Sequence, residues 1–462
     1  MPHQPLAAEL ATRDTVRIAG YKRALAFYNG QQDLGTARAR AQQQRITLNY
    51  TRTLIRKVTA FLMTGFEIGV DPPDEALEDA ARAAEAALAE VSRNNDLPNL
   101  DYATEIDTAV LGDGAFKVTW DPDAGAVIVT SPDVQRLWAW GDPRDPNTTD
   151  RVAQQYTLTP PALAATWGIL RAGHAPVTVT EDWTPAELRV HVDRNPLPEQ
   201  ALPNPYGWLP FVIFPNEPVP QERWGESDVL PLIDAARELN DAHTRLRNLL
   251  NLTGFPITVL EGVDSAEGLA AQAGAIWTLP TGARAYALDL LQHGAIGQHL
   301  AYLETIKSAL FDLAETPRAA FGDNQRDLSG VALEVELLPL LHKVARKRAI
   351  RGTAYSNRAS LILATLDRFT GTTHLNAGMP SVHWQTPTPR DRAREIRNES
   401  ERIQNHLTST RSALVRLGDV DPDTELELAF GYGPSAELAI ARCSAQLEMR
   451  RWGFLPGRLR TV

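Results

Sequence analysis

Aspartate side chains are the residues of this 462-residue chain that come nearest to a catalytic set. Asp121, Asp123, Asp133, Asp142 and Asp145 lie close together in the sequence. A nuclease can hold two cations about 4 Å apart between such carboxylates, so a metal-dependent nuclease is one hypothesis. Each of these residues also sits beside proline or glycine, where short aspartates bond their own backbone in turns. The turn role is the simpler interpretation of the cluster.

Other catalytic patterns are missing from the sequence. It has no Walker A loop, no His-Glu-x-x-His, no Gly-x-Ser-x-Gly and no dinucleotide-binding glycine pattern after a strand. The histidine pairs His293 with His299 and His374 with His383 lack both helical spacing and cysteine partners. The single cysteine, Cys443, excludes an internal disulfide and fits a reducing cytoplasm. We therefore expect no catalytic residues, no metal site and no cofactor.

Charge argues against a protein that grips nucleic acid over a broad surface. The net charge is -11, opposite in sign to what phosphate binding requires. Basic residues cluster locally, and we expect one such run to be a solvated or subunit-facing surface: His342, Lys343, Arg346, Lys347, Arg348 and Arg351. The sequence also has no apolar run near the roughly 20 residues that cross a bilayer, and no secretory signal is expected at its start.

The first part of the chain, to about residue 226, mixes helix and strand patterns and is expected to be α+β. Apolar residues at helical spacing predict helices at 18–28, 49–61 and 75–91. Runs rich in β-branched residues predict a hairpin over 115–130 and strands at 154–158, 177–183, 188–192 and 208–215. A proline-rich stretch, 196–220, is predicted to mark a change of unit.

Long helices dominate the second part. After Ser227-Asp228, which can cap a helix, an apolar stripe runs to Leu250, and a small mixed module is predicted over 252–294. A second striped helix stops before Pro317. The longest helix signal, from Val331 to about Arg368, contains Pro339, whose ring and missing N–H force a kink. A strand at 381–385 and a charged helical block from residue 390 complete the pattern.

The polar, glycine-bearing segment from Thr316 to Ala332, between the last two helices, resembles the tunnel loop of tailed-bacteriophage portal (head-tail connector) proteins. In that family Ser-Gly-x-Ala-Leu, here Ser329 to Leu333, opens a long kinked helix. Other segments resemble family features in the same order along the chain: Tyr28-Asn29-Gly30, Ala109 to Asp121, Gly225 to Asp228, and Leu417 to Asp423. The resemblance covers most of the sequence.

The resemblance implies an α+β portal-type subunit with an α/β wing, a two-helix stem, a small mixed clip, a long kinked helix and a helical crown. The expected boundaries are: N-terminal wing 1–226, first stem helix 227–251, clip 252–294, second stem helix 295–316, tunnel loop 317–330, long kinked helix 331–368, wing return strand 369–390 and crown 391–462.

It also implies roles for single residues around the tunnel loop. Side chains that could contact DNA passing through the tunnel are Arg318, Phe321, Asn324, Gln325 and Arg326. The hinge between the loop and the long helix is expected at Ser329, Gly330 and Pro339.

The function that the resemblance implies is mechanical. Portal subunits form a ring, usually a dodecamer, at one capsid vertex, and double-stranded DNA passes through it during packaging and ejection. The expected partners are further copies of the chain, the terminase large subunit, the head-tail adaptor, and the major capsid and scaffolding proteins. The expected location is the virion, with the host cytoplasm during assembly and no membrane. A metal-dependent nuclease acting on phage DNA and a monomeric scaffold with helical arms remain the alternatives, and oligomeric state separates them from a portal.

Overall fold

The computed structural model divides the chain into unit 1, Met1–Pro387, and unit 2, Thr388–Val462. Helices and several small antiparallel sheets give a mixed α/β fold, in agreement with the predicted class. The structure describes residues 6–31, 46–142, 144–145, 148–193, 195–254, 258–263, 278–287, 295–322, 330–387, 392–417 and 425–426.

Five helices share the largest core of unit 1. They are α2 (Thr15–Tyr28), α4 (Tyr50–Leu62), α6 (Leu97–Leu111), α8 (Ile233–Gly254) and α9 (Ala295–Leu313). In α4, Asn49 caps the first turn by accepting a hydrogen bond from the N–H of Arg52 (3.1 Å). Of the apolar stripe predicted along this helix, Phe61 is partly buried and four residues are buried: Leu54, Ile55, Val58 and Leu62. Burial of each such side chain contributes roughly 1.5–3 kcal/mol, so packing of this stripe holds α4 in place.

A three-stranded sheet, in the order β3-β2-β9, forms the second core with α5 (Glu78–Asn94) and α10 (Gly330–Thr370). Its strands are β2 (Asp113–Asp121), β3 (Ala126–Thr130) and β9 (Phe211–Pro215), which confirms the predicted hairpin. A separate pair, β1 (Phe66–Asp71) and β12 (Met379–Trp384), also packs on α10, where Phe66 stacks on Tyr355 with ring centroids 4.7 Å apart.

A five-stranded sheet carries the third core. In spatial order its strands are β4 (Leu137–Trp140), β5 (Arg151–Leu158), β6 (Val177–Trp183), β7 (Glu187–Val192) and β8 (Asn195–Pro203). The short helices α1 (Leu6–Thr12) and α7 (Pro160–Trp167) pack against this sheet. The prediction of a change of unit at 196–220 is wrong, because this stretch runs through β8 and β9 inside unit 1. β8 tolerates its prolines because it is an edge strand, with one side free of ladder bonds.

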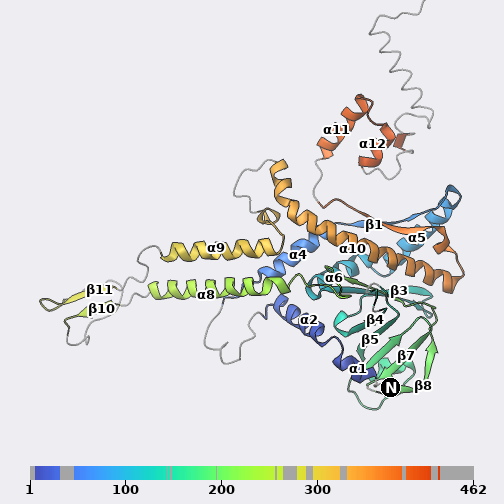
Figure 1. Cartoon of the computed structure of the whole chain (residues 1–462), viewed down its shortest axis with the longest axis horizontal. Helices are drawn as coiled ribbons and strands as arrows, with labels where there is room; N and C mark the ends of the chain where they lie inside the picture. Colours follow the sequence, from blue (N-terminus) through green and yellow to red (C-terminus); the bar gives the residue numbers. More distant parts are fainter. Residues whose placement is uncertain are drawn as a thin grey trace, which may run out of the picture. The chain divides into compact units, whose positions relative to one another are not determined.

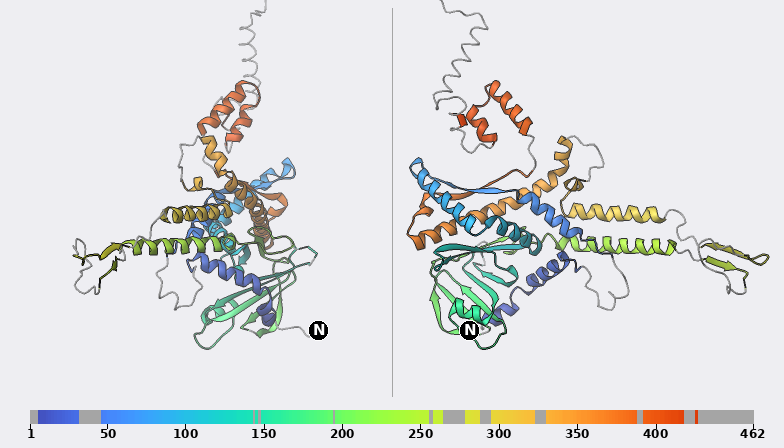
Figure 2. Two further views of the ribbon diagram at one scale, coloured as in Figure 1. Left: turned by 60° about the vertical axis from the view of Figure 1, so that its left-hand side comes forward. Right: turned by 180° about the vertical axis from the view of Figure 1, so that it is seen from behind.

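The helices α8 and α9 lie side by side and run in opposite directions (Figures 1 and 2). The 22 residues of α8 rise about 33 Å. Between the two helices in sequence, β10 (Thr258–Glu261) pairs with β11 (Arg284–Ala287) as an antiparallel ladder. This order of elements matches the sequence prediction of a striped helix, a small module and a second striped helix.

The longest helix is α10, which spans 41 residues with Pro339 inside it. Figure 1 shows that its first turns are inclined to the rest, as the proline predicts. Short 3-10 helices are η1 (Glu75–Leu77), η2 (Val134–Arg136), η3 (Leu230–Leu232), η5 (Arg318–Phe321) and η6 (His374–Ala377). In unit 2 the described helices are α11 (Arg392–Gln404) and α12 (Thr410–Leu417), joined by an ion pair of Arg416 with Glu399 at 2.8 Å. No helix among the described residues is long and apolar enough to cross a bilayer.

Candidate functional site at the base of the loop between α9 and α10

The structure places four of the predicted loop and hinge residues. Arg318 and Phe321 are the first and last residues of η5, Gly330 is the first residue of α10, and Pro339 lies inside α10. The other four, Asn324, Gln325, Arg326 and Ser329, lie outside the described residues. The predicted tunnel loop thus begins with a short helix that has contacts of its own.

Aromatic and ionic contacts hold η5 against its surroundings. The ring of Phe321 meets that of Phe311 on α9 edge to face, with centroids 5.3 Å apart, and the ammonium of Lys57 lies 5.2 Å from the Phe321 centroid. The guanidinium of Arg318 donates to Glu304 at 2.7 Å, although 27% of the Arg318 side chain stays exposed. The structure therefore gives both residues contacts on α4 or α9 at the base of the loop.

α10 also contacts the segment that follows the end of α9. The ammonium of Lys343 donates to the backbone oxygen of Ala314 at 3.3 Å, just after the end of α9. Arg346 donates to both carboxylate oxygens of Glu315 at 2.8 and 3.0 Å. The end of α9, where the loop begins, is thus tied to one stretch of α10.

A buried carboxylate connects α10 to the start of α8. Asp228 pairs with Lys347 at 2.7 Å and with Lys343 at 3.3 Å, and Lys347 also donates to the side chain of Asn216. Burial alone would raise the pKa of Asp228, but the two ammonium groups and the hydrogen bonds hold that pKa well below its ordinary value. Asp228 was predicted to cap a helix together with Ser227. Neither side chain caps the helix that follows, η3, whose N-cap residue is Val229; Ser227 instead accepts from the N–H of Val229 at 3.0 Å in a local turn.

Two further ion pairs continue along α10. Arg351 makes a bidentate pair with Glu105 on α6, both bonds at 2.9 Å, and also donates to the backbone oxygen of Asn216 at 2.7 Å. Arg358 pairs in the same way with Asp101 on α6. These side chains are buried. Cations with such partners are stable in the interior, whereas removing one partner leaves an uncompensated charge.

The expectation of a solvated or subunit-facing basic run is therefore wrong for three of its members. Lys343, Lys347 and Arg351 follow one another at intervals of four residues, which puts them on one face of a helix, and that face is buried. Their carboxylate partners come from Asp228 and from α6, far away in the sequence. The local charge pattern of residues 342–351 gives no sign of those partners.

A second buried carboxylate lies at the start of β2, close to segment 225–228. Asp113 accepts from the N–H of Gly225 at 2.8 Å and from the hydroxyl of Tyr21. Burial raises the pKa of Asp113 to about 6, against the lowering effect of these hydrogen bonds and of nearby arginines. Burial and the Asp113 carboxylate also raise the pKa of the Tyr21 hydroxyl. Asp113 and Asp228 thus fix the two ends of segment 225–228.

The aspartates of the nuclease hypothesis make turns. Asp121 accepts from the N–H groups of Asp123 and Ala124 at 2.9 and 3.2 Å. Asp133 accepts from Gln135 and Asp142 from Arg144 in the same manner, at 3.0 and 2.9 Å. The turn interpretation is confirmed for these three, and no group of three metal-ligating side chains occurs in the part of the chain that the structure describes.

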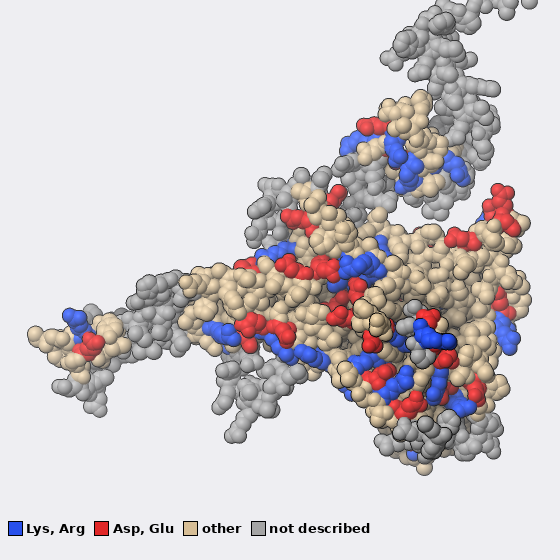
Figure 3. All heavy atoms as spheres, viewed as in Figure 1, with Lys and Arg blue, Asp and Glu red and all other residues tan. Residues whose placement is uncertain are grey.

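The surface around α8 and α9 carries both signs of charge. Figure 3 shows acidic and basic side chains interspersed on the visible face of unit 1. On α8 and α9, Arg245 pairs with Glu238 at 3.2 Å and Lys307 with Glu304 at 3.8 Å. Such a face offers scattered cations instead of a broad basic stripe, in keeping with the net charge of -11.

Comparison with known proteins places this arrangement in a family. The family model described as phage portal protein, SPP1 Gp6-like, matches residues 178–430, which is more than half of the chain. The matched region contains α8, α9, the loop between α9 and α10, and all of α10. No curated protein matches the chain. From the extent of the family match, the chain belongs to the SPP1 Gp6-like family of phage portal proteins.

Proposed function

We propose that copies of this chain assemble into a closed dodecameric ring at one capsid vertex, through which double-stranded DNA enters during packaging and leaves during ejection. Family membership supports a portal role in general. The observation that carries the ring is on the stem helices, where Leu250, Leu300 and Leu313 are 47%, 50% and 53% exposed. Apolar side chains of this size gain by burial, and neighbouring stems would cover them.

The loop between α9 and α10 is proposed as the tunnel loop. Its middle residues, Asn324, Gln325 and Arg326, would face passing DNA. Arg318 and Phe321 would contribute mainly as anchors, because both side chains already have partners at the loop base. Ser329, Gly330 and Pro339 are proposed as the hinge through which the loop joins α10. Residues 391–462 are proposed as the crown.

The clip, residues 252–294 with the β10-β11 ladder, is proposed as the docking site for the terminase large subunit and later for the head-tail adaptor. The wing would face the major capsid and scaffolding proteins. The protein would act in the virion after assembly in the host cytoplasm, without catalysis, cofactor or membrane. Nothing favours the nuclease alternative, because three of its five carboxylates satisfy turn N–H groups.

Mass photometry of the purified chain tests the ring. Twelve copies of 50.8 kDa weigh about 610 kDa, and we expect a single particle near that mass. Changing Leu250 and Leu300 together to glutamate should shift the population to monomers, because like charges would replace apolar contacts at each interface. Gln298→Glu, which adds the same charge at an exposed position of α9, should leave the rings intact. A wild-type chain that stays monomeric at micromolar concentration contradicts the proposal.

A further inference from the structure

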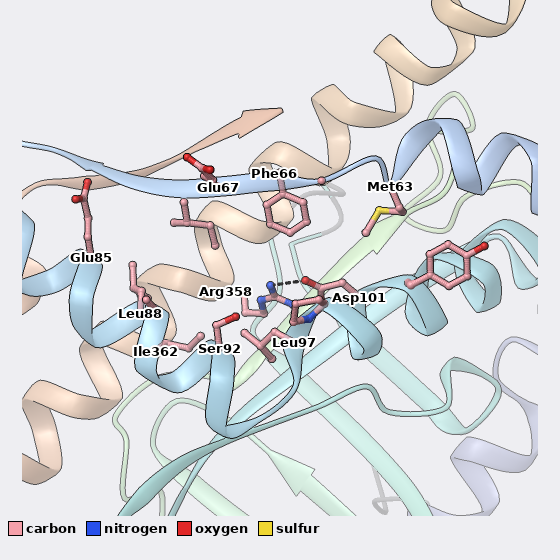
Figure 4. Close-up of a pocket in the computed structure, with 15 residues that line it drawn as sticks. Met63, Phe66, Glu67, Glu85, Leu88, Ser92, Leu97, Asp101, Arg358 and Ile362 are labelled. Atoms are coloured by element: carbon pink, nitrogen blue, oxygen red, sulfur yellow. Dashed lines mark hydrogen bonds and ion pairs between the residues drawn. The ribbon is translucent and has the colours of Figure 1, made fainter. Parts of the chain in front are cut away.

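A groove on unit 1 lies away from the stem and the loop. It has a volume of about 570 Å³ and is bounded by β1, α5 and α6, with α10 at its base. Figure 4 shows Phe66 of β1 pointing into it and Leu88, Leu97 and Ile362 contributing further apolar surface. Of the ion pairs described above, only that of Arg358 with Asp101 borders this space.

The strand that borders the groove has an unpaired edge. Among the described residues β1 pairs only with β12. The N–H of Val70 faces away from β12, because it donates to Glu85 on α5 at 2.8 Å and its cross-strand neighbour is Pro380. Backbone groups alternate along a strand, so those of Phe66 and Ile68 face the same way as Val70. Phe66 and Ile68 line the groove, and among the described residues no strand pairs with this edge of β1.

A buried donor lies at the base of the groove. The Arg358 side chain is 1% exposed, and two of its nitrogens donate to Asp101. Its Nε–H has no acceptor among the described residues. A buried N–H without an acceptor costs about 1–3 kcal/mol, and more for a charged group. Its guanidinium packs over the rings of Phe116 and Tyr355, 4.4 and 4.9 Å from their centroids, so Arg358 forms the closed base of the groove.

The charged side chains at the rim of the groove favour some bound molecules over others. Glu67 points to the opposite side of β1 from Phe66, and Glu85 rises from α5 toward the strand (Figure 4). Glu67 is exposed, and Glu85 accepts from the N–H of Val70, but no ion pair of either carboxylate is found in the described part of the chain. The one cation that lines the groove, Arg358, is neutralised by Asp101. The carboxylates at the rim can therefore form ion pairs with basic side chains of a bound molecule.

We propose that this groove binds an extended peptide segment of a partner protein, which adds as a strand to the free edge of β1. Its backbone would pair with the backbone groups of Phe66 and Ile68. Side chains alternate across a sheet, and opposite neighbours interact. Residues beside Phe66 and Ile68 would therefore be apolar, and the residue beside Glu67 would be lysine or arginine. This inference does not depend on ring formation or on DNA.

Selection from a random heptapeptide library on the purified full-length chain tests the proposal. Enriched peptides should alternate apolar with basic residues. Their affinity, measured by fluorescence polarisation, should fall at least about tenfold in Ala89→Trp, because the indole would fill the groove. Ala83→Trp is the matched control: it lies on the other side of α5, is exposed, and should change affinity less than about twofold.

Three outcomes would overturn the proposal. The first is a library that yields no peptide sensitive to Ala89→Trp. The second is binding without slower amide hydrogen exchange in peptides covering residues 64–70, since strand addition must protect Phe66 and Ile68. The third is a change of oligomeric state in Ala89→Trp but not in Ala83→Trp, which would make the groove a contact between copies. Glu67→Lys should weaken basic peptides while leaving the fold intact, as Glu67 is exposed.

Discussion

Single buried carboxylates determine how the parts of unit 1 join. Asp228, Asp113, Glu105 and Asp101 each accept hydrogen bonds from segments far away in sequence. Three of the four pair with cations on one helix, α10. In the interior such pairs contribute more to specifying one arrangement than to raw stability, and their loss is costly.

The first residue-scale prediction concerns Asp228→Asn. It leaves Lys343 and Lys347 without a carboxylate partner in the interior, and we expect the free energy of unfolding at pH 7 to fall by about 3–5 kcal/mol. The depressed pKa of Asp228 gives stability that is present above its ordinary value and is lost as pH falls toward the folded-state value. The penalty, measured by urea denaturation, should therefore shrink below about pH 4.

The exposed pair of Arg346 with Glu315 provides the control, since both side chains are more than 40% exposed. Glu315→Gln should cost less than about 1 kcal/mol. An equal loss in both variants would show that burial of the Asp228 pair has no special effect.

The second residue-scale prediction concerns Tyr21→Phe, which removes the hydroxyl that donates to Asp113. Because the pKa of Asp113 is raised to about 6, its contribution to stability is complete below its ordinary pKa and is lost as pH rises through about 6. A hydrogen bond to an ionised group is worth about 1.5–3 kcal/mol and a neutral one about 1 kcal/mol. Tyr21→Phe should therefore cost more at pH 8 than at pH 5 in urea titrations.

Tyr102→Phe, at an exposed tyrosine of α6, should show no such pH dependence. If the cost of Tyr21→Phe were the same at both pH values, Asp113 would not titrate in this range.

At the scale of elements, the periodicity of apolar residues predicted the amphipathic helices and strands. It missed elements whose structure depends on partners far away in the sequence. The helices at 18–28 and 49–61, the β2-β3 hairpin and the long helix with Pro339 were all visible as local patterns. β1 was missed, because Phe66–Asp71 becomes a strand by pairing with β12 more than 300 residues later. α6 was missed because its buried face carries Asp101, Thr104, Glu105 and Thr108 among apolar residues.

The buried ion pairs were predictable in part. Asp101 with Glu105, and Lys343 with Lys347 and Arg351, follow spacings of four residues that place like charges on one helix face. Like charges so arranged repel unless another element supplies the opposite sign, which is a signal for a buried partner. The sequence could not identify which acidic and basic faces meet, because that depends on the packing of α6 against the rest of unit 1.

The element-scale prediction tests the loop between α9 and α10 apart from η5, which holds its base. Replacing residues 322–329 by a glycine-serine linker of equal length keeps the described contacts of η5, so rings should form while DNA packaging fails. Phe321→Ala keeps the rest of the loop but removes the ring contacts with Phe311 and Lys57. We expect it to lower the melting temperature by a few degrees, roughly 1–2 kcal/mol. Normal phage yield with the linker would rule out the tunnel-loop proposal.

For the whole molecule, the net charge of -11 and the interspersed surface charges bear on how DNA passes. Each phosphate neutralised by a protein cation adds binding and releases a counterion. A conduit that lets DNA slide in both directions benefits from few such contacts. The mixed surface of the stem satisfies that requirement better than a basic one.

Purified rings should accordingly bind duplex DNA weakly, with affinity that collapses between low and physiological salt. The expected slope of log K against log salt corresponds to about one to three phosphates per chain. Electrophoretic mobility shifts at several salt concentrations measure it. Cleavage of DNA that requires magnesium or manganese, and that is lost in the double variant Asp121→Ala, Asp123→Ala, would instead support the nuclease hypothesis.

The pairing of β1 with β12 also determines when unit 1 can complete its fold during translation. Residues 66–71 leave the ribosome about 310 residues before their partner strand, an interval of roughly 15–60 s at bacterial elongation rates. During that interval the nascent wing also lacks α10, and with it the cations for Asp228, Glu105 and Asp101. Unit 1 can therefore complete its fold only once nearly all of it has been translated.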